Sequence, residues 1–235
     1  MRKLTALLLA LALTLGLSAA FADTQITVTG SGEVLIPADV AVISLGVNVR
    51  SAEAPSAQAE ANEVIAKIRE ALTAAGIDEE DISTGYINLY AAYDYSSSVE
   101  RITGYNASST LAVKVTDMTR VGEVIDLAFG AGANMLDGVS FSAKDDTAAR
   151  AEALKAAVAD AKAKADVLAE AAGLGKLEID SIAESGVYAY DSGTNNFSAK
   201  GMITEQAEDA ATVIRAAKIC VSASVTITYE VKEKD

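Results

Sequence analysis

The sequence has no histidine, no tryptophan and a single cysteine among its 235 residues. Without histidine there is no Ser-His-Asp or Cys-His catalysis, no imidazole proton transfer and no histidine-containing metal site. One cysteine cannot form an intramolecular disulfide, a CxxC redox pair or a cysteine-based zinc site. These absences exclude several large classes of enzyme before any motif is considered.

Basic residues are also scarce, since 19 Lys and Arg stand against 33 Asp and Glu, for a net charge of −14. Such an excess of negative charge repels nucleic-acid phosphates and anionic lipid, so neither is expected as a partner. Aromatic residues make up only 5% of the chain, although 51% of it is hydrophobic. This mainly aliphatic content is enough for a packed core and excludes a mostly disordered chain.

The first 22 residues predict a secretory signal peptide. Arg2 and Lys3 precede an apolar run over 4–17, and the small-residue pattern Ala20-Phe21-Ala22 is typical of a cleavage site. The run is shorter than a transmembrane helix needs, and no later stretch is long and apolar enough to span a bilayer. We therefore expect an exported bacterial protein, periplasmic or extracellular, whose mature domain covers 23–235.

Hydrophobic periodicity predicts alternating strands and helices along the mature chain. Strands are expected over 24–36, 43–49, 82–94, 104–115, 139–143, 177–190 and 221–231. Helices are expected over 56–75, with Ser56 as cap, from 117 or 119 to 131, and from 145 or 146 to 172. This order predicts an α+β fold with a largely antiparallel or mixed sheet, packed by two long helices and a shorter one. One domain and two small α/β lobes both fit the length, and 191–218 is expected to be irregular.

The longest predicted helix has a narrow seam of mostly small residues: Leu154, Val158, Ala161, Ala165, Leu168 and Ala172. Two structures fit this spacing, a coiled-coil seam and a helix lying close against a sheet. Alanine favours the sheet, because a small side chain permits a close approach.

Two glycine pairs and two acidic clusters are candidate binding sites. Gly30-Ser31-Gly32 and Gly130-Ala131-Gly132 do not complete a dinucleotide or Walker motif, so they are interpreted as bend and cap glycines. The clusters at 78–81 and 145–146 could hold a hard cation, but neither matches a calcium-binding loop. Acidic residues at a turn or a helix start have ordinary structural roles. No catalytic, cofactor-binding or metal-binding residue is predicted.

Tyrosines gather in two places. Five lie in or beside the predicted hairpin of the strands over 82–94 and 104–115, and two lie near the end of the strand over 177–190: Tyr86, Tyr90, Tyr93, Tyr95, Tyr105, Tyr188 and Tyr190. Tyrosine is common in strands for its β propensity alone. It is also favoured at interfaces, where its ring is buried and its hydroxyl keeps a partner. The hairpin is therefore a candidate contact surface.

Cys220 precedes the last strand, on the side of Ser222 and Ser224. If that face is solvated, Cys220 is a free thiol able to pair between chains. If the face is covered, Cys220 is an inert small core residue, which we favour.

Short motifs along nearly the whole mature chain occur in the same order as in a known family. They are Val28-Thr29-Gly30-Ser31-Gly32-Glu33, Pro37-Ala38-Asp39, Leu45-Gly46-Val47, Asp81-Ile82-Ser83-Thr84, Gly104-Tyr105-Asn106-Ala107-Ser108, Ala131-Gly132-Ala133-Asn134, Glu152-Ala153-Leu154 and Ser222-Ala223-Ser224-Val225. Together they resemble the SIMPL-domain proteins, which include bacterial periplasmic immunogenic proteins.

The resemblance implies an exported α+β protein, assembled in some members into large ring-like or channel-like homo-oligomers. It also implies a link to oxidative and other stress responses, and it brings no established catalytic residues. The leading hypothesis is a non-enzymatic, self-associating cell-envelope protein with a role in the stress response. The alternatives are a periplasmic module that binds a small ligand or cation and, third, a carboxylate-dependent hydrolase.

Overall fold

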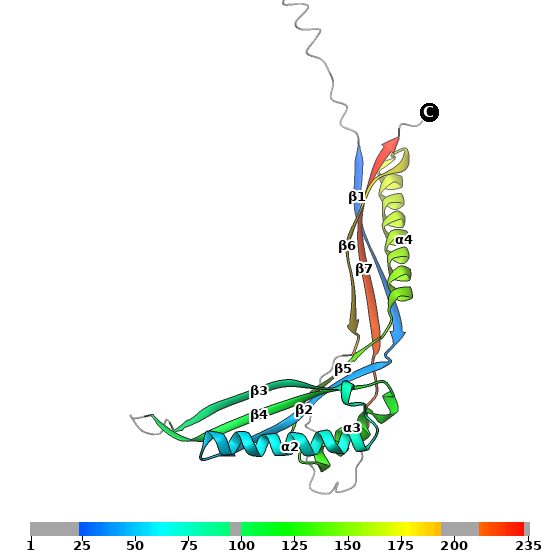
Figure 1. Cartoon of the computed structure of the whole chain (residues 1–235). Helices are drawn as coiled ribbons and strands as arrows, with labels where there is room; N and C mark the ends of the chain where they lie inside the picture. Colours follow the sequence, from blue (N-terminus) through cyan, green and yellow to red (C-terminus); the bar gives the residue numbers. More distant parts are fainter. Residues whose placement is uncertain (1–23, 95–99, 194–211, 233–235) are drawn as a thin grey trace, which may run out of the picture. The chain divides into compact units, whose positions relative to one another are not determined.

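A computed structural model describes residues 24–94, 100–193 and 212–232. The chain forms two compact units (Figure 1). Unit 1 contains the described residues up to Gly32, together with Leu154–Gly186 and the described residues from Ser224 on. Unit 2 contains Glu33–Ala153 and the described part of Val187–Ala223.

Unit 2 is built on a four-stranded sheet in the order β3-β4-β2-β5. The strands are β2 (Val40–Ser51), β3 (Ile82–Asp94), β4 (Arg101–Val115) and β5 (Met135–Ser142). Each neighbouring pair in the sheet is antiparallel. The expected α+β fold is thus confirmed, and the expected hairpin is formed by β3 and β4. Strands β4 and β5 begin a few residues earlier than their alternation predicts.

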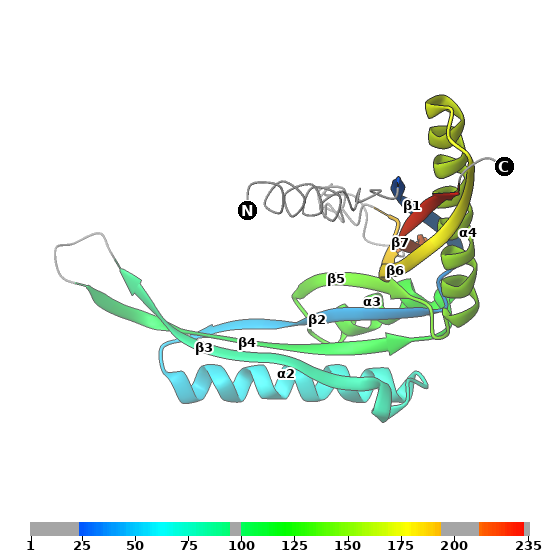
Figure 2. The ribbon, with the colours of Figure 1, turned by 90° about the horizontal axis from the view of Figure 1, so that it is seen from above.

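The core of unit 2 lies between this sheet and two helices. Helix α2 (Ala54–Ala74) runs alongside the strands (Figure 2), and α3 (Val121–Gly130) packs against the same core. Ile43 and Leu45 of β2 are fully buried against Ile68 and Leu72 of α2. Each such side chain contributes about 1.5–3 kcal/mol when it leaves water.

The start of α2 corrects one sequence prediction. Ser56 was expected to cap the helix, but the helix begins at Ala54 with Glu53 at the N-cap position, so that Ser56 lies inside its first turn. Pro55 explains the earlier start, because its fixed φ suits a first helical turn and it has no N–H to satisfy. The predicted stop is confirmed: Gly76 has φ +85°, a conformation in which glycine avoids a side-chain clash.

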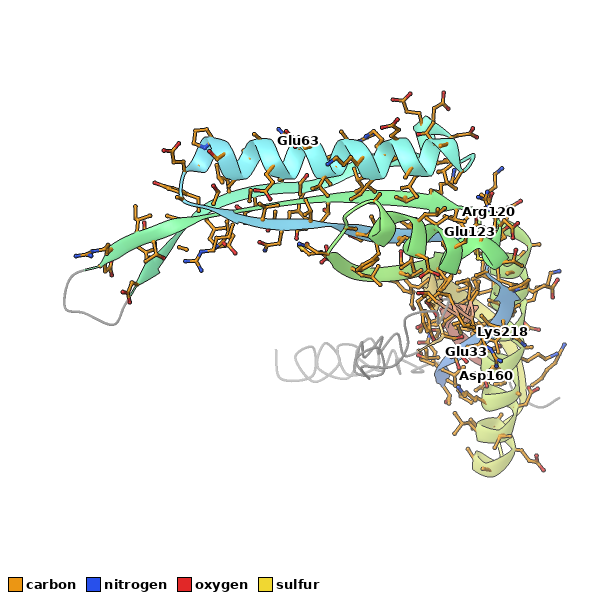
Figure 3. The ribbon with its side chains drawn as sticks, turned by 90° about the horizontal axis from the view of Figure 1, so that it is seen from below. Glu33, Glu63, Arg120, Glu123, Asp160 and Lys218 are labelled. Carbon is orange, nitrogen blue, oxygen red and sulfur yellow. The ribbon has the colours of Figure 1, made fainter. Side chains whose placement is uncertain are left out.

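The short helix begins and ends with the residue types expected from the sequence. The Asp117 carboxylate accepts hydrogen bonds from the Thr119 N–H at 3.0 Å and hydroxyl at 2.6 Å, opening the turn η2 (Met118–Arg120) before α3. Arg120 pairs with Glu123 at 3.1 Å (Figure 3). Gly132, with φ +110°, follows the end of α3, as expected for a cap glycine.

A second sheet has the order β1-β7-β6. Its strands are β1 (Gln25–Pro37), β6 (Lys176–Asp191) and β7 (Lys218–Lys232). The Val231 N–H donates to the Thr24 carbonyl at 3.0 Å, and the hydroxyls of Thr27 and Thr228 lie 3.1 Å apart. Because residue numbers rise along β1 as they fall along β7, the two strands are antiparallel.

Helix α4 (Thr147–Ala172) lies beside the second sheet (Figure 1). Its buried residues recur at every fourth position and are all alanine: Ala149, Ala153, Ala157, Ala161, Ala165 and Ala169. The expectation of a small-residue seam against a sheet is confirmed, but part of its predicted membership is wrong. Val158 and Leu168, which were placed in the seam, are 36% and 49% exposed.

Gly30 of β1 explains why the seam is made of alanine. A Cβ placed on Gly30 would lie 2.6 Å from the backbone nitrogen of Ala161 and closer still to the Ala157 carbonyl oxygen. The helix backbone therefore touches the strand, and larger residues do not fit at this contact. The sequence interpretation of Gly30 as a bend glycine is corrected to a close-packing glycine.

The segment expected to be irregular falls partly outside the described residues, which omit 194–211. Residues 212–217 form neither helix nor strand, as expected of an irregular segment. Thr212 is held by Asp126 of α3, whose carboxylate accepts from the Thr212 N–H at 3.0 Å and hydroxyl at 2.6 Å.

Candidate interaction surface

Strand β3 forms one border of the four-stranded sheet (Figure 1). Leu89 pairs with Ala107 of β4, and Ala107 packs in a buried cluster with Ala57 and Ala61 of α2. The side chain of Leu89 therefore lies on the face of the sheet that carries α2, and its neighbour Tyr90 lies on the opposite face.

The hairpin leaves large apolar side chains in solvent on β3 and at the start of β4. Six of them are between 41% and 60% exposed: Tyr86, Ile87, Leu89, Tyr90, Tyr93 and Ile102. We call these six residues the hairpin surface. Helix α2 covers Val47 and Val49 of β2 and Ala107 of β4, which are buried, and leaves the middle of β3 exposed. A group of exposed apolar residues of this kind is typical of an interaction site.

The direction in which the backbone N–H and C=O groups of β3 point can be deduced from the neighbouring strands. Asn134 accepts a hydrogen bond from the Asn48 N–H at 2.7 Å and donates one to the Asn48 carbonyl at 2.9 Å, so the backbone of Asn48 points away from β4. Its partner Ser108 must then direct its backbone groups toward Asn88 of β3. The alternate residues of β3 consequently direct their N–H and C=O groups outward: Ile87, Leu89 and Ala91.

Within the part of the chain that the structure describes, no side chain bonds to the outward backbone groups in the middle of β3. At its start, Arg69 of α2 donates to the Ile82 carbonyl at 3.0 Å. At the irregularity between Thr84 and Ile87, the Tyr86 N–H donates to the Thr110 hydroxyl at 3.0 Å. From Ile82 to Tyr93 the strand has no charged residue. Exposed, uncharged edge strands pair readily with other chains, which is why proteins usually protect them.

The outer border of β1, in contrast, is covered by a charged pair from α4. Asp160 accepts a hydrogen bond from the Ser31 N–H at 2.8 Å, and Lys164 donates one to the Thr29 carbonyl at 3.0 Å. The Lys164 Nζ and the Asp160 Oδ2 lie 2.7 Å apart. Figure 3 labels Asp160 on the helix. Hydrogen bonds from Lys164 and from the Ser31 N–H lower the pKa of Asp160 below its ordinary value.

The two remaining edge strands carry other protections. Strand β5 has only eight residues, shifts register opposite Ser44 and Leu45, and carries Asp137, which accepts from the Ser44 hydroxyl at 3.4 Å. Strand β6 carries acidic residues along its length: Glu178, Asp180 and Glu184. Short strands, bulges and charges all discourage edge pairing. Within the described ranges, β3 is the edge strand that combines length with an uncharged, apolar border.

The structure gathers the tyrosines much as the sequence predicted. Tyr86, Tyr90 and Tyr93 lie exposed on β3, whereas Tyr105 of β4 is half-buried beside the cluster under α2. Tyr95 falls outside the described residues. The exposure of Ile87 and Leu89 has no signal in the sequence, because an alternating strand with Ile and Leu on one face normally buries that face.

Cys220 is 4% exposed, which confirms the favoured prediction of burial. Interaction with the Cys220 side chain raises the pKa of Tyr190 above its ordinary value. Burial raises the pKa of Tyr229 in the same strand.

Three residues of the acidic clusters have ordinary structural partners. Asp81 pairs with Lys114 at 2.9 Å, Asp146 pairs with Arg150 at 2.7 Å, and Asp145 accepts from the Thr147 N–H at 2.9 Å. These contacts lower the pKa of Asp145 and of Asp146. No group of three or more Cys, Asp or Glu side chains suited to holding a metal occurs in the described part of the chain. Likewise, no helix among these residues is long and apolar enough to cross a membrane.

A depression of about 740 Å³ lies beside α3 in unit 2. Ala71 and Leu127 supply apolar surface, whereas Glu123, Asp126 and Thr212 supply polar atoms. Both acidic groups already have partners, since Asp126 accepts hydrogen bonds from Thr212 and Glu123 pairs with Arg120.

Two relatives show substantial similarity to part of the chain. The 26 kDa periplasmic immunogenic protein of Brucella melitensis is 32% identical over 142 residues, which are 58% of this chain and 57% of that protein. The uncharacterized protein YggE of Escherichia coli is 28% identical over 137 residues, which are 58% of this chain and 56% of that protein. The matched segment thus spans less than two thirds of either relative. The Brucella name agrees with the prediction of an exported protein.

A family model matches a longer part of the chain than either relative does. The model of the SIMPL family, described as a protein of unknown function (DUF541), matches residues 26–229. This range runs from β1 to β7 and includes both sheets and every helix described above. The chain therefore belongs to the SIMPL family.

Proposed function

We propose that this chain is a non-enzymatic protein of the bacterial cell envelope that self-associates through the hairpin surface and acts in the stress response. The observation that carries the proposal is the exposed, uncharged border of β3, with Ile87, Leu89 and Tyr90 in solvent. The predicted signal peptide and the periplasmic relative in Brucella support the location. The resemblance of the sequence to stress-linked bacterial proteins supports the role.

The energetics favour a reversible assembly. Ile87, Leu89, Tyr90 and Tyr93 each keep about half of their side chain in solvent, and burying that half contributes about 1 kcal/mol per residue. Two copies together would gain roughly 8 kcal/mol from these contacts, which is comparable to the free-energy cost of bringing two proteins together. Additional hydrogen bonds would therefore decide the strength of the assembly.

The first test is the mass of the chain from Asp23 onward, measured by light scattering over a range of concentrations. We expect a discrete oligomer that is insensitive to reductant, because Cys220 is buried. Leu89→Lys places a charge in the hairpin surface and should shift the population toward monomer. Val167→Lys is the matched control, since Val167 is 65% exposed on α4 in unit 1. A wild-type chain that stays monomeric at every concentration would show that the proposal is wrong.

The link between assembly and stress needs a separate experiment in cells. A strain lacking the gene receives the wild-type chain, the Leu89→Lys variant or the Val167→Lys control, exported at equal levels. We expect the wild type and the control to restore survival under oxidant and the Leu89→Lys variant to fail. Full protection by a monomeric Leu89→Lys variant would separate the stress role from self-association.

A second candidate function, binding of a small ligand, is favoured by the depression beside α3. Its apolar wall at Ala71 and Leu127 suits a small organic ligand, and a cationic ligand would share the Glu123 carboxylate with Arg120. A screen of amines by thermal shift tests this, with Glu123→Gln as the variant expected to abolish any stabilisation. Equal shifts for the wild type and Glu123→Gln would place binding elsewhere.

A further inference from the structure

We infer that β3 of one copy pairs edge to edge with β3 of a second copy, antiparallel, so that two four-stranded sheets become one continuous sheet. This inference rests on the proposed function, because it specifies how the hairpin surface is covered. It concerns backbone pairing, whereas the proposed function requires only that the surface be buried between copies.

The backbone of β3 supplies the first reason. Ile87, Leu89 and Ala91 direct their N–H and C=O groups away from β4, as the orientation of Asn48 and its partner Ser108 requires. A strand added along this border satisfies these groups directly, as in other complexes formed by strand addition. Packing on a face of the sheet would leave them to water.

The charge distribution supplies the second reason and identifies the partner. An antiparallel contact between two identical strands is self-complementary only if it does not place like charges opposite one another. β3 has no charged residue from Ile82 to Tyr93, so a copy of itself meets this condition. A charged extended peptide would find no countercharge along this border.

The other edges of the two sheets supply the third reason. The border of β1 is occupied by Asp160 and Lys164. The β6 strand is acidic and the β5 strand is short and irregular. None of these borders offers β3 a matching neutral partner, which favours a twofold contact of β3 with itself over a head-to-tail contact.

Pairing in this manner would also bury the hairpin surface. Ile87 and Leu89 from both copies would gather on the face that carries α2, and Tyr90 from both copies would gather on the opposite face. Cross-strand pairs of aliphatic and aromatic residues stabilise such a sheet. The apolar and backbone contributions thus come from the same few residues.

The test removes one outward N–H and leaves charge and apolar surface nearly unchanged. Ala91→Pro deletes an N–H that makes no bond to β4, and proline is tolerated at such edge positions. Because a twofold contact loses two hydrogen bonds, we expect the dimer dissociation constant to rise about thirtyfold. Circular dichroism and the melting temperature of the monomer check that the variant is folded.

A charge-swap pair keeps the test decisive if Ala91→Pro folds poorly. Asn88→Lys and Asn88→Asp each place like charges across the twofold axis and should weaken association when alone. An equimolar mixture should restore it as a heterodimer, since the charges then attract across the pairing. Light scattering and native mass spectrometry measure both the mass and the composition.

The outcomes separate this inference from the proposed function. In one outcome the wild type associates and Leu89→Lys is monomeric, but Ala91→Pro and the single Asn88 variants associate as the wild type does. That outcome shows that the edge pairing is wrong and that self-association through the hairpin surface is correct. If wild type never associates, both are wrong. If Ala91→Pro weakens association and the Asn88 mixture restores it, β3 pairing is supported.

Discussion

Gly30→Ala is the substitution for which the structure makes the sharpest stability prediction. Gly30 lies on β1 beneath α4, and a methyl group there would lie 2.6 Å from the Ala161 nitrogen and 2.7 Å from its Cβ. It would lie closer still to the Ala157 carbonyl oxygen. Backbone atoms of a helix cannot rotate away, so the helix itself must move.

The size of the effect follows from that movement. Ordinary carbon contacts begin near 3.5 Å, so α4 must shift by roughly 1 Å from β1. The shift loosens the alanine seam around Ala161 and stretches the bonds that Asp160 and Lys164 make to the strand edge. Overpacking of this kind costs about 1–3 kcal/mol, and the contact with rigid backbone places Gly30→Ala near the upper value. A loss of about 3 kcal/mol corresponds to a fall in melting temperature of about 6–12 °C.

The assay is thermal and urea denaturation followed by far-ultraviolet circular dichroism. Gly130→Ala is the matched control, because a Cβ at Gly130 would have no atom within 4 Å. That control should be neutral or stabilising by less than about 1 kcal/mol, since alanine restricts the unfolded chain. If Gly30→Ala and Gly130→Ala change stability equally, the close packing of α4 on Gly30 is refuted.

Three further predictions concern single side chains. Asn134→Ala should cost about 1–2 kcal/mol in urea denaturation, because both bonds to the Asn48 backbone are lost; a loss no larger than that of Asn88→Ala would contradict this. The folded-state pKa of Asp160 is lowered from 3.8, so its stabilisation is present above that value and is lost as pH falls through the folded pKa. The melting-temperature difference between wild type and Asp160→Asn should therefore be present at neutral pH and vanish in strong acid, and a pH-independent difference would refute the assignment. Cys220 is 4% exposed, so a thiol reagent should label it only as the chain unfolds; rapid labelling of the native protein would show an accessible thiol.

Periodicity predicted most of the elements, because it records which face of each strand or helix leaves water. In β7 the alternation from Val221 to Tyr229 matches the buried positions of the structure. In α2 the buried residues Ala57, Ala61, Ile68 and Leu72 likewise recur at helical spacing. The tyrosines of the hairpin were also recognised as a group. The exposure of Leu89 on β3 was not, since it depends on how far α2 reaches across the sheet.

The seam of α4 shows where periodicity misleads. Hydrophobicity placed Val158 and Leu168 against the sheet, but the buried stripe runs through Ala157 and Ala161 instead. The reason lies in Gly30, a residue more than a hundred positions earlier, whose missing side chain lets the helix backbone approach. A pattern within one helix contains no information about that partner.

The sequence alone predicted the export signal and established the α+β class, the family resemblance and the absence of histidine and disulfide chemistry, because each depends on composition or on near neighbours in the chain. The state of the sheet edges depended on the folded structure. Asp160 and Lys164 look in the sequence like an ordinary pair on one helix face, yet in the fold they bind the backbone of β1. Among the described residues, no side chain covers the middle of β3 in this way. Protection of an edge is a matter of which distant side chains reach its backbone groups, and only folding brings those atoms together.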